Sequence, residues 1–163
     1  MIMKYLRGIG IALGLIGLVT LVAHARSPQT RAQQSNRVGL VVGFGDGTYA
    51  TECVRFTEPG ISGFETLMRS DLDVVSNGGA VCGIEGTGCP ADDCFCAAPD
   101  YWSYWHLIDG TWQYSGSGAQ GYVVHDGGVE GWHWGSQPPP TLVFDQICPS
   151  FTVHIPIVLA GGS

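Results

Sequence analysis

The stretch 101–135 limits the possible folds of this chain most, because aromatic residues and turn residues alternate along it. It holds all five tryptophans and four of the six tyrosines. Asp109-Gly110 and Asp126-Gly127-Gly128 have the composition of tight turns between antiparallel strands, since glycine adopts positive φ angles without steric cost. The pattern predicts a meander of strands over 101–108, over 111–114 together with 122–125, and over 129–134.

Alternation along these strands places aromatic side chains on both faces of the predicted sheet. Trp102 and Tyr104 share one face of the first strand, and Tyr101 and Trp105 share the other. In the last strand Glu130, Trp132 and Trp134 face one way, and Val129, Gly131 and His133 face the other. One small core does not absorb so many rings easily, so we expect some of them to be exposed and to contact a ligand.

The residues that we expect to contact a ligand are all aromatic: Trp102, Tyr104, Trp105, Trp112, Trp132 and Trp134. Trp132 and Trp134 are expected to form one platform, because they share a face of the last strand. Among the six, Trp105 is expected to belong to the core.

The first 25 residues have the pattern of a secretory signal peptide. Lys4 and Arg7 precede the apolar run 9–22, and Ala23 and Ala25 are small residues where a signal peptidase cleaves. An uncleaved membrane anchor is the alternative, but the run is shorter than the roughly 20 residues that span a bilayer. We therefore expect a secreted or cell-surface protein with no membrane span after cleavage, with 26–37 as a flexible tether.

The charge balance of the remaining chain disfavours two classes of partner. Without Lys4 and Arg7, five of the seven basic residues remain against fourteen acidic residues. Five scattered cations do not form the basic patch that nucleic acids or anionic lipids require. Neither partner is expected.

The six cysteines, Cys53, Cys82, Cys89, Cys94, Cys96 and Cys148, predict a disulfide framework, since the count is even and the chain is expected to be exported. A metal site at Cys89, Cys94 and Cys96 with His106 is the alternative, but the spacing is not that of a common zinc site. Among the many possible pairings we expect Cys53 to pair with Cys148. The other four would then pair among themselves.

The segment before the aromatic stretch predicts a hairpin followed by a helix. Strands over 38–44 and 48–56 flank Gly45-Asp46-Gly47. Ser62 and Glu65 form a capping box, in which each side chain satisfies a free amide at the start of a helix. Phe64, Leu67 and Met68 give this helix one apolar face, and we expect no other helix after residue 25.

Short strands at 73–75 and 80–85 lead into the cysteine-rich loop 86–99, which we expect to be held by disulfides. Such rigid loops often bind ligands, although they also compensate for a small core. After the aromatic stretch, residues 136–140 predict a stiff proline-rich spacer. The remainder is a tail with a β-rich run at 151–159.

The order hairpin, capped helix and further strands is that of a β-grasp fold, an α+β architecture. The motif GLVVGFGDG, the helix after an acidic Pro-Gly turn, and the block YWxYW…DGxWxYS…G…YxVxDGxVEGWxWG resemble a bacterial secreted family of unassigned function. That family is related to the C-terminal domain of the cobalamin carriers transcobalamin and intrinsic factor. The resemblance covers about 38–135. Its most specific part falls on Tyr104-Trp105, the glycine-containing bend 116–121, and Val124 to Trp132.

The resemblance implies a β-grasp domain that binds a ligand, with cobalamin as one candidate, and membrane transporter components as possible partners. The large helical barrel with which the carriers enclose cobalamin has no counterpart here. The cysteine-rich insertion 86–99 is also outside the family pattern.

Three non-catalytic functions fit these patterns: a ligand-binding module, which we favour, a carbohydrate-binding module, and a structural or adhesive surface domain. No enzyme is expected. His106, His125 and His133 lie in three different predicted strands, and neither Ser103 nor Ser115 lies in a nucleophile-elbow motif. The glycines of GSGAQG match a dinucleotide fingerprint only weakly, because a strand rather than a helix is predicted after them.

Overall fold

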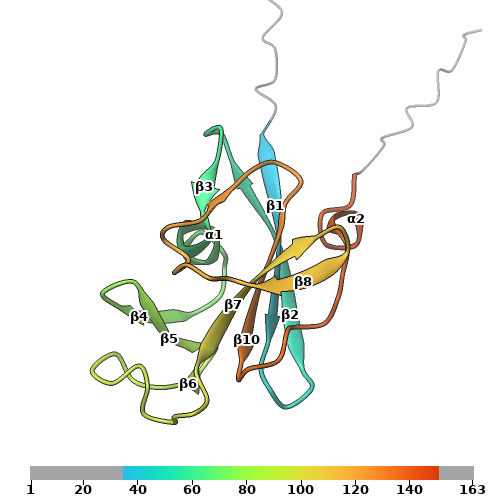
Figure 1. Cartoon of the computed structure of the whole chain (residues 1–163). Helices are drawn as coiled ribbons and strands as arrows, with labels where there is room; N and C mark the ends of the chain where they lie inside the picture. Colours follow the sequence, from blue (N-terminus) through green and yellow to red (C-terminus); the bar gives the residue numbers. More distant parts are fainter. Residues whose placement is uncertain (1–34, 151–163) are drawn as a thin grey trace, which may run out of the picture. The chain divides into compact units, whose positions relative to one another are not determined.

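The computed structural model describes residues 35–150 of the chain (Figure 1). The predicted signal peptide, nearly all of the predicted tether and the β-rich run at 151–159 lie outside the described residues. Within 35–150 no helix is long and apolar enough to cross a membrane.

A five-stranded mixed sheet forms the centre of the described domain (Figure 1). Its strands, in spatial order, are β2 (Tyr49–Phe56), β1 (Asn36–Gly43), β10 (Val129–Trp134), β7 (Trp102–Ile108) and β8 (Thr111–Tyr114). The central pair β1 and β10 is parallel, and the other neighbours are antiparallel. The first and last long strands of the chain therefore lie side by side.

Smaller elements surround this sheet. They are β3 (Ile61–Ser62), α1 (Gly63–Met68), β4 (Val74–Asn77), β5 (Ala80–Ile84), β6 (Thr87–Gly88), β9 (Val123–Val124) and α2 (Phe144–Ile147). The predicted α+β class is confirmed. The prediction of a single helix after residue 25 is wrong, because α2 forms a second short helix.

The meander predicted for 101–135 is correct for its first two strands only. β7 and β8 form a hairpin, but β9 pairs with β3 in a separate two-stranded sheet. β10 then crosses to the sheet centre, where it lies between β1 and β7. Turn residues predict where the chain reverses, but they do not predict which strand the next segment joins.

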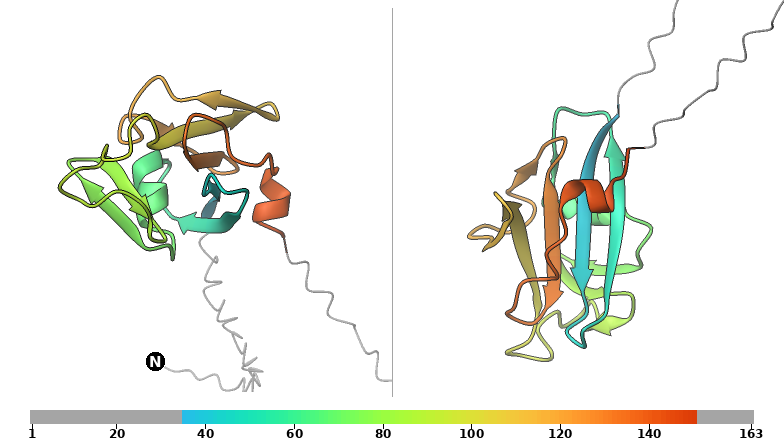
Figure 2. Two further views of the ribbon diagram at one scale, coloured as in Figure 1. Left: turned by 90° about the horizontal axis from the view of Figure 1, so that it is seen from below. Right: turned by 90° about the vertical axis from the view of Figure 1, so that its right-hand side faces the viewer.

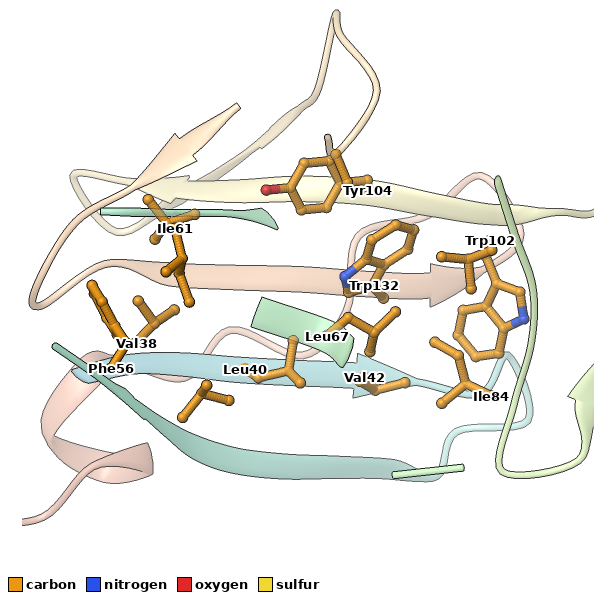
Figure 3. Packing of buried hydrophobic residues seen from close by; sticks show 14 residues of the cluster. Val38, Leu40, Val42, Phe56, Ile61, Leu67, Ile84, Trp102, Tyr104 and Trp132 are labelled. Carbon is orange, nitrogen blue, oxygen red and sulfur yellow. The ribbon is translucent and has the colours of Figure 1, made fainter. Parts of the chain in front are cut away.

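One face of the sheet carries the larger of the two hydrophobic clusters (Figure 3). Val38, Leu40 and Val42 point to this face because they alternate along β1, and Leu67 of α1 packs against them. The aromatic side chains Trp102, Tyr104 and Trp132 extend the cluster along β7 and β10. The predicted face assignments of β7 and β10 are thus confirmed.

Of the two hydrogen bonds of the capping box predicted at the start of α1, one forms. The backbone N–H of Glu65 donates to Ser62 Oγ at 3.0 Å. The Glu65 carboxylate, however, forms an ion pair with Arg69 instead of returning to the cap. Only half of the predicted capping box therefore forms, because Arg69 lies one turn further along the same side of the helix.

The opposite face of the sheet is covered by the segment that follows β10. Ile147 of α2 packs against Val41 and Val129, and Pro139 is buried against Gly131. The left view of Figure 2 shows α1 and α2 on opposite sides of the sheet. Residues 136–140 were predicted to be a spacer, but the burial of Pro139 makes this segment part of the domain.

All six cysteines are paired, as predicted. Cys53 of β2 is bonded to Cys148, which fixes the covering segment to the sheet. Cys82 is bonded to Cys94, and Cys89 to Cys96. The described residues 35–150 contain no cluster of metal-ligating side chains, and Cys89, Cys94 and Cys96 have no free thiol.

Candidate functional site

A cavity of about 380 Å³ lies beside β7, next to the larger of the two hydrophobic clusters. Four segments form its wall: the start of β5, the disulfide-bonded loop, the strands β7 and β8 with Trp132 of β10, and the bend 115–119. These segments are far apart in the sequence. The cavity therefore depends on the folded domain, and we call it the aromatic cavity.

Three buried aromatic side chains, Trp102, Tyr104 and Trp132, belong to the wall of the aromatic cavity and also to the core. The rings of Tyr104 and Trp132 stack with their centroids 4.8 Å apart. The indole N–H of Trp102 donates to the carbonyl of Thr87 at 3.3 Å. Their positions are consequently fixed by packing before any ligand arrives.

Three further aromatic residues, Phe95, Tyr101 and Tyr114, line the same cavity closer to solvent. Phe95 is 62% exposed and Tyr114 is 54% exposed. The hydroxyls of Tyr101 and Tyr114 lie 3.1 Å apart, and the Trp105 ring packs edge-on against Tyr114. The exposed aromatic surface that the sequence predicts is thus found mainly on phenylalanine and tyrosine.

Phe95 is held at the cavity by the cysteines on either side of it. Cys94 is bonded to Cys82 in β5, and Cys96 is bonded to Cys89 in the same loop. A large apolar side chain that is both exposed and covalently restrained on both sides contributes little to the core. Because the loop is already restrained, binding a ligand costs less conformational entropy of the loop.

The bend 115–119 contributes Gly116 and Gly118 to the wall of the cavity. Neither glycine has a positive φ, and a Cβ added at either meets no atom within 4 Å. Internal packing and backbone conformation therefore do not require glycine at these positions. The bend is anchored, because the N–H of Ser115 donates to the carbonyl of Tyr104 at 2.9 Å.

The side chains that line the aromatic cavity carry no full charge. They include no lysine, arginine, histidine, aspartate or glutamate. Their side-chain polar groups are the hydroxyls of Tyr101, Tyr114, Ser115 and Ser117 and the indole N–H groups of Trp102 and Trp132, whereas the Tyr104 hydroxyl is bonded to Glu130. Such a lining suits a neutral ligand with an apolar face, since burying an ion here would cost free energy without a compensating partner.

A buried polar network lies on the far side of Tyr104. The hydroxyl of Tyr104 donates to Glu130 Oε2, and His106 Nδ1 lies 2.8 Å from the same oxygen. Glu130 is 2% exposed, and burial raises the pKa of its carboxyl while the bonds from His106 and Tyr104 oppose the rise. The ring of Tyr122 stacks on His106 at a centroid distance of 3.5 Å.

The histidines considered as catalytic candidates do not meet. His106 points to the same face of the sheet as Tyr104, whereas His133 lies on the opposite face against Gly43. His125 is exposed, and its Nδ1 contacts the carbonyl of Pro59 at 2.9 Å. The Ser103 hydroxyl donates to the carbonyl of Gly135 at 2.6 Å.

Of the six predicted ligand contacts, the structure places Trp102, Tyr104 and Trp132 in one cavity wall. Trp105 lies behind Tyr114, Trp112 packs on Gly131, and Trp134 packs on Trp102. The prediction that Trp105 belongs to the core is wrong: Trp105 is only half-buried, whereas Trp102 and Trp132 are fully buried. Trp132 and Trp134 share a face as predicted, but they pack into the core instead of forming an exposed platform.

No family model matches the chain, and no curated protein matches it.

Sequence reasoning missed Phe95, Tyr101 and Tyr114 in the cavity and the network around Glu130. A signal existed for both. Phe95 stands between two cysteines of a loop expected to be rigid, and Glu130 alternates onto the aromatic face of its strand. A charged side chain on a core face predicts a buried hydrogen-bonding partner.

Proposed function

We propose that this protein is an exported, non-catalytic binding domain whose ligand is uncharged and carries a flat or ring-shaped apolar face. The observation that supports this most is the aromatic cavity, which combines three fixed core rings with three rings near solvent and no charged side chain. Stacking on aromatic faces recognises rings without requiring charge. The three disulfides are compatible with an oxidising compartment outside the cell.

The sheet order supports a β-grasp fold as part of the proposal. The parallel central pair β1 and β10, the antiparallel neighbours β2 and β7, and a helix after the first hairpin support this assignment. This agrees with the resemblance to the bacterial family related to the C-terminal domain of transcobalamin and intrinsic factor. The resemblance remains part of the proposal.

Cavity size restricts the ligands. A volume of about 380 Å³ lies in the lower part of the range of small-molecule sites, roughly 300–1,000 Å³. Cobalamin is much larger than this, so only part of a corrinoid would enter. In that case the exposed residues Phe95 and Tyr114 would contact the remaining surface of the ligand, and transporter components would be the recipients of the complex.

A carbohydrate is the second candidate, and one observation favours it. Tyr101 and Tyr114, whose hydroxyls lie 3.1 Å apart, line the same cavity as the exposed ring of Phe95, and Ser117 lies on the bend that completes the wall. Sugar rings present an apolar face for stacking and hydroxyls for neutral hydrogen bonds. One or two sugar units would fit the aromatic cavity better than a whole corrinoid.

A fluorescence titration distinguishes the two ligand classes. Trp102 and Trp132 line the cavity, so a ligand that enters it changes their emission. The oxidised domain would be titrated with cobalamin, a corrinoid precursor, haem and a panel of oligosaccharides. Saturable quenching by a corrinoid or haem supports a tetrapyrrole-like ligand, and a saturable shift with sugars supports a carbohydrate. If no compound changes the emission, a structural or adhesive role replaces the binding proposal.

A further inference from the structure

A second cavity, of about 290 Å³, lies at the opposite end of the Tyr104–Glu130 hydrogen bond. The end of β7, with Leu107 and Ile108, forms one part of its wall. The segment from Tyr122 to Glu130, which includes β9, forms the rest. No residue lines both cavities, so this one, which we call the Glu130 cavity, is a separate space.

Glu130 is the polar group that distinguishes this cavity. Its side chain is almost completely buried, yet it lines the cavity wall. Both hydrogen-bonding partners found within residues 35–150, Tyr104 and His106, bond to Oε2. Those residues supply no hydrogen-bond partner for Oε1. A buried carboxylate accepts several hydrogen bonds when ionised, so Oε1 has unused capacity beside an open space.

The other lining groups favour a positive ligand. Asp126 adds a second carboxylate, and neither lysine nor arginine lines the Glu130 cavity. His125 is a lining residue, and its Nδ1 contacts the carbonyl of Pro59. Asp126 Oδ1 accepts the backbone N–H of Arg37 at 2.7 Å, and the Arg37 guanidinium is directed to the carbonyl of Cys148 at 3.1 Å. Among the residues described, Glu130 therefore has only His106 as a basic partner.

The remaining walls supply apolar and aromatic surface. Ile108 contributes an aliphatic side chain, and the half-buried Tyr122 contributes an aromatic ring. The side chains of Leu107 and Val129 belong to the hydrophobic cluster on the opposite face of the sheet. A positive group next to a carboxylate and an aromatic ring gains both a charge-assisted hydrogen bond and a cation–π attraction. An apolar body attached to that group would lie against the side chain of Ile108.

We propose that the Glu130 cavity binds a small organic cation, a primary ammonium group on a compact apolar body, with the ammonium donating to Glu130 Oε1. This site is independent of the ligand proposed for the aromatic cavity. Tyr104 contributes to both sites: its ring lines the aromatic cavity, and its hydroxyl donates a hydrogen bond to Glu130 of the second cavity.

The test uses benzylamine, which is protonated at neutral pH, and benzyl alcohol, which has a similar shape without the charge. Binding would be followed on the oxidised domain by two-dimensional NMR of backbone amides. We expect saturable shifts at 107–108 and 122–130 with benzylamine, and binding of benzyl alcohol at least about tenfold weaker, because charge-assisted hydrogen bonds are the stronger ones. Equal binding of both compounds, or no saturable shift, would overturn the proposal.

Two variants complete the experiment. Glu130→Gln should remove the preference for the amine, provided that the variant folds. Ile108→Trp enlarges a side chain that lines the cavity and is already 39% exposed, so it should block binding with little effect on folding. Val143→Trp, at an exposed position outside both cavities, is the matched control. Undiminished binding by Ile108→Trp would show that the amine binds elsewhere and would contradict the proposal.

Discussion

Tyr104 connects the packing of the core with the buried charge of Glu130. Its ring stacks on Trp132, and its hydroxyl donates to the carboxylate. Tyr104→Phe removes the hydroxyl and leaves a buried acceptor with one partner fewer. We expect the free energy of unfolding to fall by about 1–3 kcal/mol, as measured by urea denaturation.

Tyr114→Phe is the matched control for this change. The Tyr114 hydroxyl is exposed and contacts only the hydroxyl of Tyr101 among the residues described. Its removal should change the unfolding free energy by less than about 0.5 kcal/mol. If the two variants lose the same stability, the hydrogen bond to Glu130 does not have the role assigned to it.

Gly63 allows the Tyr104 hydroxyl to lie against the start of α1. A Cβ added at Gly63 would overlap the Tyr104 hydroxyl and ring. Gly63→Ala should therefore lower the midpoint of thermal unfolding, because overpacking reduces the free energy of unfolding by about 1–3 kcal/mol. Gly118→Ala, where an added Cβ meets no atom within 4 Å, should leave the midpoint nearly unchanged. Equal midpoints for both variants would contradict this packing.

At the residue scale, alternation along the strands predicted correctly to which face each side chain points, but not which face is buried. It placed Trp132 and Glu130 on the same side of their strand, and the structure confirms this. It did not predict that this side is the core, because a strand pattern with aromatic residues on both faces does not say what covers either face. Trp105 was therefore assigned to the core in place of Trp102.

At the scale of elements, the segment after β10 is a structural part of the domain. It covers the second face of the sheet, and the Cys53–Cys148 bridge joins positions 95 residues apart. The double variant Cys53→Ala/Cys148→Ala should lose about 2–4 kcal/mol of unfolding free energy, because the unfolded chain regains freedom over a long loop. Urea denaturation measures the loss.

The double variant Cys89→Ala/Cys96→Ala is the comparison, since its bridge closes a separation of only 7 residues. It should cost less stability than loss of the long bridge. It should also weaken ligand binding at the aromatic cavity, because Phe95 loses one of its two flanking restraints. A larger stability loss from the short bridge than from the long one would contradict this account.

Most element positions could be predicted from the sequence, because turn residues and apolar alternation are local signals. The two hairpin strands, the start of α1 and the strand at β10 all lie within a few residues of their predicted positions. α2 was missed because it has only four residues, too few for a helical period. The pairing of β9 with β3 was missed because strand pairing is a long-range property.

For the whole molecule, pH should affect stability through His133. Burial lowers the pKa of this imidazole below its ordinary value of 6.5, and no other cause contributes. The folded protein therefore favours neutral His133. This contribution to stability is complete above pH 6.5 and is lost as the pH falls through the lower pKa of the folded state.

His133→Phe should remove this acid-sensitive contribution while it keeps a ring against Gly43. Thermal midpoints of the wild type and the variant would be compared from pH 7.5 down to about 4.5, near and below the ordinary histidine pKa. The midpoint of the wild type should fall relative to that of the variant as the pH decreases. A constant difference across this range would contradict the prediction, because His133 would then have the same pKa in the folded and unfolded states.

The sheet also explains the many aromatic residues of the whole molecule. Trp102, Trp132 and Trp134 are taken up by one covered face, and Trp112 by the other. The sequence suggested exposed indoles because the covering of the second face depends on the distant contact of Ile147 and Pro139 with the sheet. Much of the predicted ligand surface is consequently core, and the exposed rings that line the aromatic cavity are Phe95 and Tyr114.

The central claim is that the aromatic cavity binds an uncharged ring-bearing ligand through its exposed rings. The most direct test is the dissociation constant of the best compound from the fluorescence panel for the double variant Phe95→Ala/Tyr114→Ala. Tyr49→Ala, which removes an exposed ring outside both cavities, is the control. At about 1–3 kcal/mol per stacked ring, the double variant should bind at least about tenfold more weakly, while the control binds as the wild type does. Unchanged binding by the double variant would contradict the claim.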